Sequence, residues 1–321
     1  MKSQRETWGD TLAELGATNP DIVVLDGDLA SSTKADIFAR THPDRFLEMG
    51  IAEQNMVGVA VGLATMGYVP WLSSFAVFLT HRSLDQIRML VAQPQANVKI
   101  GAAYAGLLTG LTGKTHQDVQ DLAIMRAMPG MTVLAPGDEI ECAAMTRWAT
   151  EFAGPVYLRL TRDPTPPLFD STYRFEPGRV YQLRDGRDVL LISTGPQTGR
   201  CLDAAALLEA TGVSVGVLHV PSIKPVDAPA IVRAVRRPRL LVSVEEHTVI
   251  GGLGGLVAEI VTTHTPRRLV RIGLEDCWSE SAPNDFLLEK HGLAASRVAE
   301  RVALELRHKK TAPGGRHGLK R

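Results

Sequence analysis

Glu53 is the side chain whose surroundings in the sequence most clearly indicate chemistry. It lies in FLEMGIAEQNMVGVAVGLA (residues 46–64), where small and apolar residues dominate. This stretch has no continuous polar face, so we predict a helix that is buried on all sides, with Glu53 near its start. A buried carboxylate needs a partner, and an apolar setting favours its protonated form. Glu53 is therefore either an acid placed for proton exchange or a carboxylate that stabilises the helix N-terminus through the helix dipole.

Polar and aromatic residues that follow predicted strands are the next candidates. The segment DGDLASS (residues 26–32) follows a short apolar run, and ligand groups in α/β proteins often lie at the carboxyl ends of strands. A surface turn of Asp, Gly and Ser is the alternative. A long Gly- and Thr-rich loop (residues 106–118) contains His116, and loops of this length in compact folds are usually functional or mobile. Phe75 and Phe78 are either core residues or a platform for a cofactor ring.

The elements that must position these residues alternate between short apolar strands and amphipathic helices. In the first half of the chain, the predicted strands are residues 22–25, 68–75, 98–104, 131–136 and 155–160. The main helices predicted there, besides the Glu53 stretch, are residues 5–15 and 138–152. In the second half, the predicted strands are residues 189–193, 213–220, 240–245 and 269–273. The helices predicted there are residues 198–211, 227–236, 252–263, 283–290 and 294–307.

This alternation implies parallel sheets. We predict an α/β fold with two consecutive parallel-sheet domains, residues 1–162 and 188–307. Residues 163–187 contain four prolines and no helical period, and we predict that they form a linker. Residues 308–321 are predicted to be a disordered basic tail.

Composition and charge argue against several classes of function. The formal net charge is zero, and five basic residues follow His308, so the rest of the chain is slightly acidic. This distribution argues against nucleic-acid binding. No window reaches the about 18 apolar residues of a membrane span, and the polar N-terminus lacks the apolar core of a signal peptide. Three widely spaced cysteines predict neither a disulfide framework nor a zinc site and favour a cytoplasmic protein.

Taken together, several segments resemble the transketolase family of thiamine-diphosphate enzymes. They are similar to its pyrimidine-binding domain followed by its C-terminal domain, over about residues 5–306. The GIAEQN and THQ motifs are specific in combination and weak apart. The matching segments are DGDLASS (26–32), FLEMGIAEQNMVGVAVGLA (46–64), SSFAVF (73–78), GKTHQDVQDLAIMRAMPGMTVLAP (113–136), PVYLRLTRDPTP (155–166) and EEHTVIGGLGG (245–255).

The resemblance implies roles for residues on the cofactor side. Glu53 is expected to hydrogen-bond the aminopyrimidine ring of thiamine diphosphate and to exchange a proton with it, which suits a carboxyl in an apolar setting. Phe75 and Phe78 match the aromatic residues that pack on this ring. Asp28 and Leu29 match loop positions next to the thiazolium ring. The family's residues on the cofactor side are therefore matched in this sequence.

On the substrate side, the resemblance is incomplete. His116 matches a histidine that reaches the substrate oxygens, and neutral imidazole suits proton transfer near pH 7. Arg162 matches an arginine that holds the sugar phosphate, and Ser32 matches a substrate-contacting serine. However, Tyr104 lies where a histidine is common, and Thr112 lies where an aspartate would bind a substrate hydroxyl. Thiamine-diphosphate chemistry is therefore implied more strongly than pentose-phosphate specificity.

One domain of a full transketolase has no counterpart in this sequence. A full transketolase has a diphosphate-binding domain with a GDG…N signature, and DGD at residues 26–28 is not that motif. The first predicted helix begins near Arg5, so we expect no such domain ahead of it. No ligand set for Mg²⁺ stands out in the sequence, and this ion needs oxygen ligands together with the diphosphate. We therefore expect a separate N-terminal subunit that supplies the magnesium and diphosphate sites, in an α2β2 heterotetramer.

The expected function is that of the C-terminal (beta) subunit of a split transketolase. Such an enzyme transfers a two-carbon ketol unit from a ketose phosphate to an aldehyde acceptor. One alternative is the beta subunit of a 2-oxo-acid dehydrogenase, although THQ and LTRDP are more typical of sugar substrates. Others are transfer of the two-carbon unit to a lipoyl or protein carrier and, less favoured, a 1-deoxyxylulose-5-phosphate synthase. A non-catalytic interaction subunit is the alternative from a different class.

Overall fold

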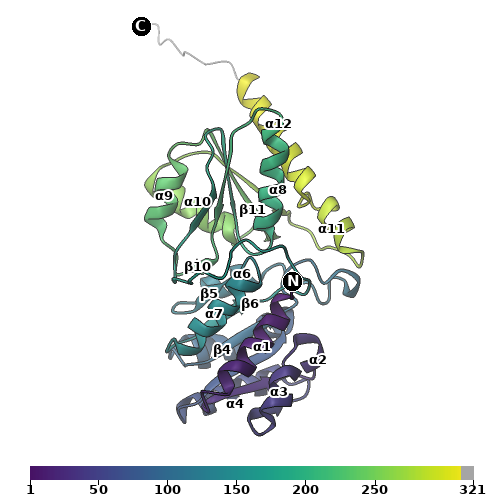
Figure 1. The fold of residues 1–321 in the computed structure, drawn as a ribbon, viewed down its shortest axis with the longest axis vertical. Coiled ribbons are helices and arrows are strands. Elements are labelled where there is room, and N and C mark those ends of the chain that lie inside the picture. The colour runs from purple at the N-terminus through teal and green to yellow at the C-terminus, as the bar shows by residue number, and fades with distance from the viewer. Residues whose placement is uncertain (312–321) are drawn as a thin grey trace.

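A computed structural model describes residues 1–311 of the chain, which form two sheets with helices around them. Figure 1 shows the second-half elements above the first-half elements, with α6 (Asp121–Ala127) and β10 (Ser222–Lys224) at the junction. The predicted tail at residues 308–321 lies mostly outside the described residues. The last helix extends to Thr311, and the predicted tail stays a prediction.

The first sheet has seven strands in the order β10-β5-β6-β4-β3-β1-β2. Neighbouring strands are parallel, except that β10 is antiparallel to β5. The first-half strands are β1 (Ile22–Asp26), β2 (Phe46–Glu48), β3 (Val69–Phe75), β4 (Lys99–Ala103), β5 (Thr132–Leu134) and β6 (Val156–Arg159). The α-helices of this half, besides α6, are α1 (Gln4–Gly16), α2 (Ala30–Thr33), α3 (Asp36–Thr41), α4 (Glu53–Thr65), α5 (Leu84–Gln86) and α7 (Glu139–Glu151). Tighter or wider helical turns are η1 (Pro43–Arg45), η2 (Phe78–Arg82), η3 (Ile87–Ala92) and η4 (Gly110–Thr112).

The second sheet has five strands in the order β12-β11-β8-β9-β7, and only β7 is antiparallel to its neighbour. Its strands are β7 (Tyr181–Arg184), β8 (Val189–Ser193), β9 (Val215–His219), β11 (Leu240–Thr248) and β12 (Leu269–Leu274). The helices are α8 (Gln197–Glu209), α9 (Ala228–Val235), α10 (Leu253–His264), α11 (Asn284–Lys290) and α12 (Ala295–Thr311). The central strand β8 is buried throughout, as expected of a parallel strand covered on both faces.

The predicted fold class is confirmed, because the chain forms two largely parallel α/β sheets. Three short strands were not predicted: β2, β7 and β10. Each has at most four residues and two of them, β2 and β7, are only half-buried, so they show no apolar run. β7 lies within the predicted linker at 163–187, and β10 comes from the second half but completes the first sheet. The division of the chain at this linker stays a prediction.

The helix that carries Glu53 is not buried on all sides, so that prediction is wrong for the chain alone. The helix begins at Glu53 itself, and the preceding residues form the edge strand β2. Only Glu53, Met56, Val57 and Ala60 of α4 are buried. One face of the helix packs on the sheet, while its other apolar residues stay partly accessible.

Helix α1 is fixed to the first sheet by its first two turns. Ser3 and Glu6 form a capping box, in which each side chain accepts a hydrogen bond from the backbone N–H of the other residue. Trp8 is buried against Gly101 of β4, where a Cβ atom would lie 2.8 Å from the indole ring. A glycine at this position therefore lets α1 approach the sheet closely, which places Arg5 near the strand ends.

Several properties bear on the expected class of protein. Within residues 1–311, no helix is both long and apolar enough to cross a membrane. The three cysteines are free; Cys142 and Cys201 are buried and Cys277 is exposed. The same described residues contain no group of three or more His, Cys, Asp or Glu side chains arranged to hold a metal ion.

Candidate active site

Residues predicted from distant parts of the sequence lie at one edge of the first sheet. Asp28 and Leu29 follow β1, Phe75 ends β3, and Tyr104 follows β4. Arg162 lies shortly beyond the end of β6. The carboxyl ends of neighbouring parallel strands share one edge of a sheet. The strand order β6-β4-β3-β1 therefore places these residues side by side.

Four aromatic rings form the centre of this edge. Phe75 stacks on Tyr104 with ring centroids 4.1 Å apart, and on Phe78 at 5.6 Å. His116 meets the two phenylalanine rings edge-on, at 5.8 Å from Phe75 and 5.4 Å from Phe78. Leu29 packs against the same cluster. The structure thus brings together the aromatic pair, the loop histidine and one residue of the β1 loop.

Glu53 joins this cluster through an arginine to which no motif pointed. The Glu53 side chain is buried, and its Oε1 lies 2.8 Å from Nη1 of Arg82. The Arg82 guanidinium also lies over the Phe78 ring, 3.7 Å from its centroid. Arg82 therefore provides the partner that a buried carboxylate requires. Its position four residues after Phe78, within the single segment η2, was the available sequence signal.

The loop after β1 is held by Asp26, a second buried carboxylate. Asp26 accepts hydrogen bonds from the Ser73 hydroxyl at 2.5 Å, the Thr33 hydroxyl at 2.9 Å and the Leu29 backbone N–H at 2.6 Å. Burial raises the pKa of Asp26 to about 6, although these three donors oppose the shift. Asp28 has a positive φ of 65° and an exposed side chain. Asp26 therefore fixes the conformation that presents Leu29 to the aromatic cluster.

Replacing Asp26 with Asn is expected to change how stability depends on pH. The pKa of Asp26 is about 6 in the folded chain, against an ordinary value of 3.8. Between these pH values the folded chain binds one more proton than the unfolded chain, so the contribution of Asp26 to the free energy of unfolding falls as pH rises. The stability of the parent relative to Asp26→Asn should fall by about 2 kcal/mol between pH 4.5 and pH 7. Urea unfolding of both proteins at several pH values measures this difference, and a constant difference would contradict the assignment.

Two arginines flank Tyr104 at the outer side of the cluster. The guanidinium carbons of Arg5 and Arg162 lie 5.2 and 5.4 Å from the Tyr104 ring centroid. Arg5 donates to the Tyr104 hydroxyl at 3.2 Å, to the Arg162 carbonyl at 3.0 Å and to the Ser32 carbonyl. Ser32, Tyr104 and Arg162 thus surround Arg5. Arg5 gave no signal in the sequence, because a charged residue in the first turn of a helix is ordinarily a surface residue.

The long loop over residues 106–118, which we call the His116 loop, places its two predicted residues differently. His116 is half-buried, and its Nδ1 lies 2.8 Å from the Thr115 hydroxyl. Thr112 lies exposed on η4, and its hydroxyl donates to the Thr109 carbonyl at 3.1 Å. The structure therefore brings His116 to the rings but turns the Thr112 side chain toward its own turn.

The arrangement combines two chemical environments along one edge. At one end, a buried carboxylate is joined through Arg82 to the face of Phe78, and these groups suit a flat ring that carries N–H donors. At the other end, Arg5 and Arg162 provide fork-shaped donors that suit an oxyanion. His116 lies beside the rings, where an imidazole can exchange protons near neutral pH. Together these groups could hold a heteroaromatic cofactor and an anionic substrate.

Comparison with known proteins assigns a family to both halves of the chain. The model of the transketolase pyrimidine-binding domain matches residues 1–167. The model of the transketolase C-terminal domain matches residues 178–298. Together the two matches cover nearly all of the described residues.

Individual relatives match over almost their full length. A protein described as a putative transketolase C-terminal section, from Methanocaldococcus jannaschii, is 40% identical over 95% of this chain and 97% of its own. A 6-deoxy-6-sulfo-D-fructose transketolase subunit from a Clostridium species is 37% identical over 95% of each chain. Among solved structures, a split gene transketolase described as an inactive beta4 tetramer has a TM-score of 0.88 and 44% identity, covering 94% of this chain and 98% of that one.

Proposed function

This chain belongs to the transketolase family, and on this basis we propose that it is the C-terminal subunit of a split, thiamine-diphosphate-dependent transketolase. The proposed reaction transfers a two-carbon ketol unit from a ketose phosphate to an aldehyde acceptor. The observation that carries the proposal is the placement of Glu53, a buried carboxylate, beside the cluster of Phe75, Phe78 and His116.

The residues present fit the aminopyrimidine half of thiamine diphosphate. The Phe78 ring is half-buried, so one part of it remains accessible, and Glu53 is linked to it through Arg82. In the proposed complex, Glu53 holds a proton at the ring nitrogen, while Phe75 and Phe78 orient the ring. The cofactor, when bound, supplies the carbon that carries the two-carbon unit. Asp28 and Leu29 are proposed to line the neighbouring part of the site.

His116 and the two arginines are proposed to act on the substrate. His116 moves protons at substrate oxygens, a role suited to imidazole near neutral pH. Arg162 and Arg5 bind the anionic end of the sugar, and Ser32 and Tyr104, which contact Arg5, contribute to the same part of the site. One relative is named for a sugar that carries a sulfonate. Two guanidinium groups accommodate either a phosphate or a sulfonate, because both are tetrahedral oxyanions.

Thr112 is proposed to contact substrate only if η4 rearranges, because its hydroxyl is turned to the Thr109 carbonyl. A hydroxyl without charge also binds a sugar hydroxyl less strongly than an aspartate does. Both properties fit a substrate specificity that differs from that of pentose-phosphate enzymes.

A separate N-terminal subunit is proposed to bind the diphosphate and Mg²⁺. The structure of a relative is described as an inactive tetramer of beta chains, which fits a beta chain that requires another subunit. Apolar side chains that flank α4, or lie on the neighbouring η3, are exposed: Ile51 by 72%, Met66 by 73%, Met89 by 42% and Leu90 by 40%. Exposed apolar surface of this kind marks interfaces, and we propose that it is covered in an α2β2 heterotetramer.

The proposed reaction can be tested in the chain combined with an N-terminal transketolase subunit, thiamine diphosphate and Mg²⁺. Ketose phosphates and sulfonated ketoses are compared as donors with 2-oxo acids that have no hydroxyl group on C3. We expect ketol transfer to an aldehyde and no release of CO₂ from the 2-oxo acids. Turnover of 2-oxo acids alone would instead support the dehydrogenase alternative.

A further inference from the structure

The His116 loop is closed at its base within the first half of the chain. The Gly106 backbone N–H donates to the Asp118 carbonyl at 2.8 Å, which joins the two ends of the loop. The Asp118 carboxylate accepts from the Thr80 hydroxyl and lies 3.7 Å from Nε2 of His81. These contacts fix where the loop begins and ends. They do not hold the backbone between the two ends, which other contacts must fix.

Glu246, on β11 of the second sheet, reaches into the start of this loop. Its carboxylate is buried, and Oε1 accepts the backbone N–H groups of Leu107 at 2.9 Å and Leu108 at 3.2 Å. A Cβ atom on Gly106 would lie 2.5 Å from the same oxygen, and Gly106 has a φ of +88°. Position 106 therefore requires glycine, because the Glu246 carboxylate occupies the space that a side chain would need. The other oxygen of Glu246 lies 3.5 Å from Nη1 of Arg200, which balances the buried charge.

Two further hydrogen bonds with the second half of the chain hold the far side of the loop. The Ser281 hydroxyl donates to the Leu111 carbonyl at 2.6 Å. The Gln117 side chain, next to His116, donates to the Glu280 carbonyl at 3.1 Å. The loop thus lies between Glu246 and residues 280–281, both of which come from the second half.

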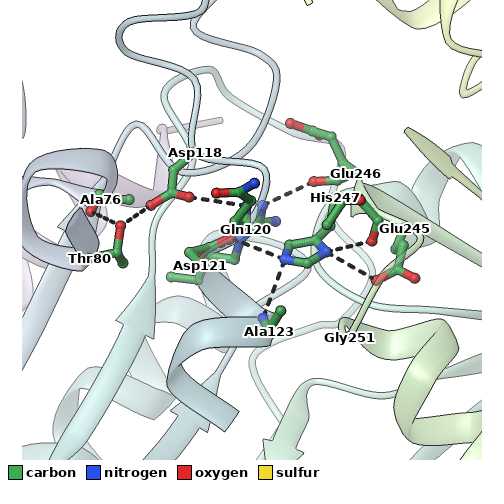
Figure 2. A network of polar contacts seen from close by, with 12 residues as sticks. Ala76, Thr80, Asp118, Gln120, Asp121, Ala123, Glu245, Glu246, His247 and Gly251 are labelled. Carbon is green, nitrogen blue, oxygen red and sulfur yellow. Dashed lines mark hydrogen bonds and ion pairs between the residues drawn. The ribbon is translucent and has the colours of Figure 1, made fainter. Parts of the chain in front are cut away.

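Buried polar contacts also fix β11 relative to the base of the loop (Figure 2). Arg159 of the first sheet donates to the Asp121 carboxylate at 2.8 Å and to the Glu246 carbonyl at 3.0 Å. His247 lies 4.0 Å from Asp121, and its Nε2 is 3.4 Å from the Ala123 backbone nitrogen. The carboxylate of Glu246 therefore extends from a strand whose position is set by the first sheet.

We propose that Glu246 is a positioning residue that fixes the His116 loop, and that this is one contribution of the second half to the reaction. The inference rests on the proposed function for the role of His116. Glu246 does not contact the aromatic cluster in any described hydrogen bond; it acts through the loop backbone. A charged acceptor forms stronger hydrogen bonds than a neutral one, so the loop is ordered before substrate arrives. Misplacement of a reacting group by about 1 Å can reduce the rate by about 10²-fold.

The neighbouring residue Glu245 provides a matched control. Glu245 is also buried on β11 and also accepts two backbone N–H groups, from Leu253 at 2.6 Å and Gly254 at 2.8 Å. These two donors open α10. The Glu245 carboxylate also lies 3.6 Å from Nδ1 of His247, and no described hydrogen bond or ion pair joins it to the His116 loop. Loss of either carboxylate should disturb folding to a similar degree, but only loss of Glu246 should release the loop.

The first measurement is hydrogen exchange in the isolated full-length chain, which does not depend on activity. In Glu246→Ala, exchange of the Leu107 and Leu108 amides should become about 10- to 100-fold faster, as expected for loss of hydrogen bonds to a charged group. Glu246→Gln keeps one acceptor oxygen and should show a smaller increase. Glu245→Gln should speed exchange at the start of α10 and leave the loop unchanged. Unchanged loop exchange in both Glu246 variants would overturn the inference, and if the Ala variant does not fold, the Gln variant alone decides.

The second measurement is steady-state kinetics of each variant assembled with the N-terminal subunit. We expect kcat to fall by about tenfold or more in Glu246→Ala, with partial recovery in Glu246→Gln and the affinity for thiamine diphosphate unchanged. Glu245→Gln should change kcat by less than about twofold. Equal losses of kcat in the Glu245 and Glu246 variants would indicate a purely structural role and overturn the inference. Absence of ketol transfer by the parent pair would instead reject the proposed function and leave the exchange result standing.

Discussion

Replacing Glu53 with Gln is expected to lower kcat of the assembled enzyme by about 10²- to 10⁴-fold, the range that a positioned acid–base group contributes. Gln has nearly the same volume and can still accept a hydrogen bond from Arg82. The packing of α4 should therefore persist. The amide, however, cannot exchange a proton with the cofactor ring. We expect a large loss of turnover without a comparable loss of subunit association.

Association is measured by analytical ultracentrifugation of the mutant chain with the N-terminal subunit, alongside the kinetic assay. Glu14→Gln is a suitable control, because Glu14 forms an exposed ion pair with Arg147 at 2.6 Å on the surface between α1 and α7. Exposed pairs of this type contribute little to stability, so this control should retain normal turnover. Normal turnover in Glu53→Gln would show that the carboxylate has a structural role only, at the N-terminus of α4.

Replacing Arg162 with Ala is expected to lower kcat/KM for phosphorylated donors by about 10²-fold, chiefly through KM. The Arg162 guanidinium lies 5.4 Å from the Tyr104 ring centroid, whereas Glu53 is paired with a different arginine, Arg82. Its loss removes charge-assisted hydrogen bonds to the substrate anion but leaves the cofactor residues in place. Arg5 remains beside Tyr104, so binding should be weakened rather than abolished.

The comparison between substrates is the internal control for this variant. Donors that lack the phosphate should show nearly the same kcat/KM in Arg162→Ala as in the parent. Arg147→Ala removes the exposed partner of Glu14 and controls for loss of an arginine in general. Equal losses with phosphorylated and unphosphorylated donors would contradict a phosphate-binding role for Arg162.

The two-sheet fold could be predicted because its evidence is local. Buried parallel strands such as β1 and β8 are continuous apolar runs, and the alternation with helices gives their order along the chain. The short strands β2, β7 and β10 could not be predicted this way. Their pairing depends on which sheet edge remains available after the other strands have packed, and a three-residue strand leaves no pattern. The partly accessible face of α4 could not be predicted either. An apolar sequence does not show how much of a helix the rest of the chain covers.

The site was predictable where a motif or a strand end marked a residue. The rings of Phe75, Phe78 and His116, which the family resemblance assigned to one site, lie in contact, and their roles stay predictions. Arg5 and Arg82 were missed because their roles come from contacts with residues distant in the sequence. Asp26 lay within a segment that was recognised, but its anchoring role depends on Ser73 of the neighbouring strand.

The contribution of the second half could not be predicted from the sequence at all. Glu246 follows another glutamate in EEH, and nothing in that pattern separates a carboxylate that binds its own helix from one that binds a distant loop. Successive side chains of a strand point to opposite faces, so the two neighbours serve different elements. The structure also shows why Gly106 cannot carry a side chain, since Glu246 occupies that space.

The most direct test of the central claim, that this chain provides one half of an active site, is a titration. The full-length chain is mixed with thiamine diphosphate, Mg²⁺, a ketose-phosphate donor and an aldehyde acceptor, and ketol transfer is followed as the N-terminal subunit is added. We predict no turnover above background without that subunit, and activity that saturates at one N-terminal subunit per chain. Full turnover by the chain alone would contradict the claim.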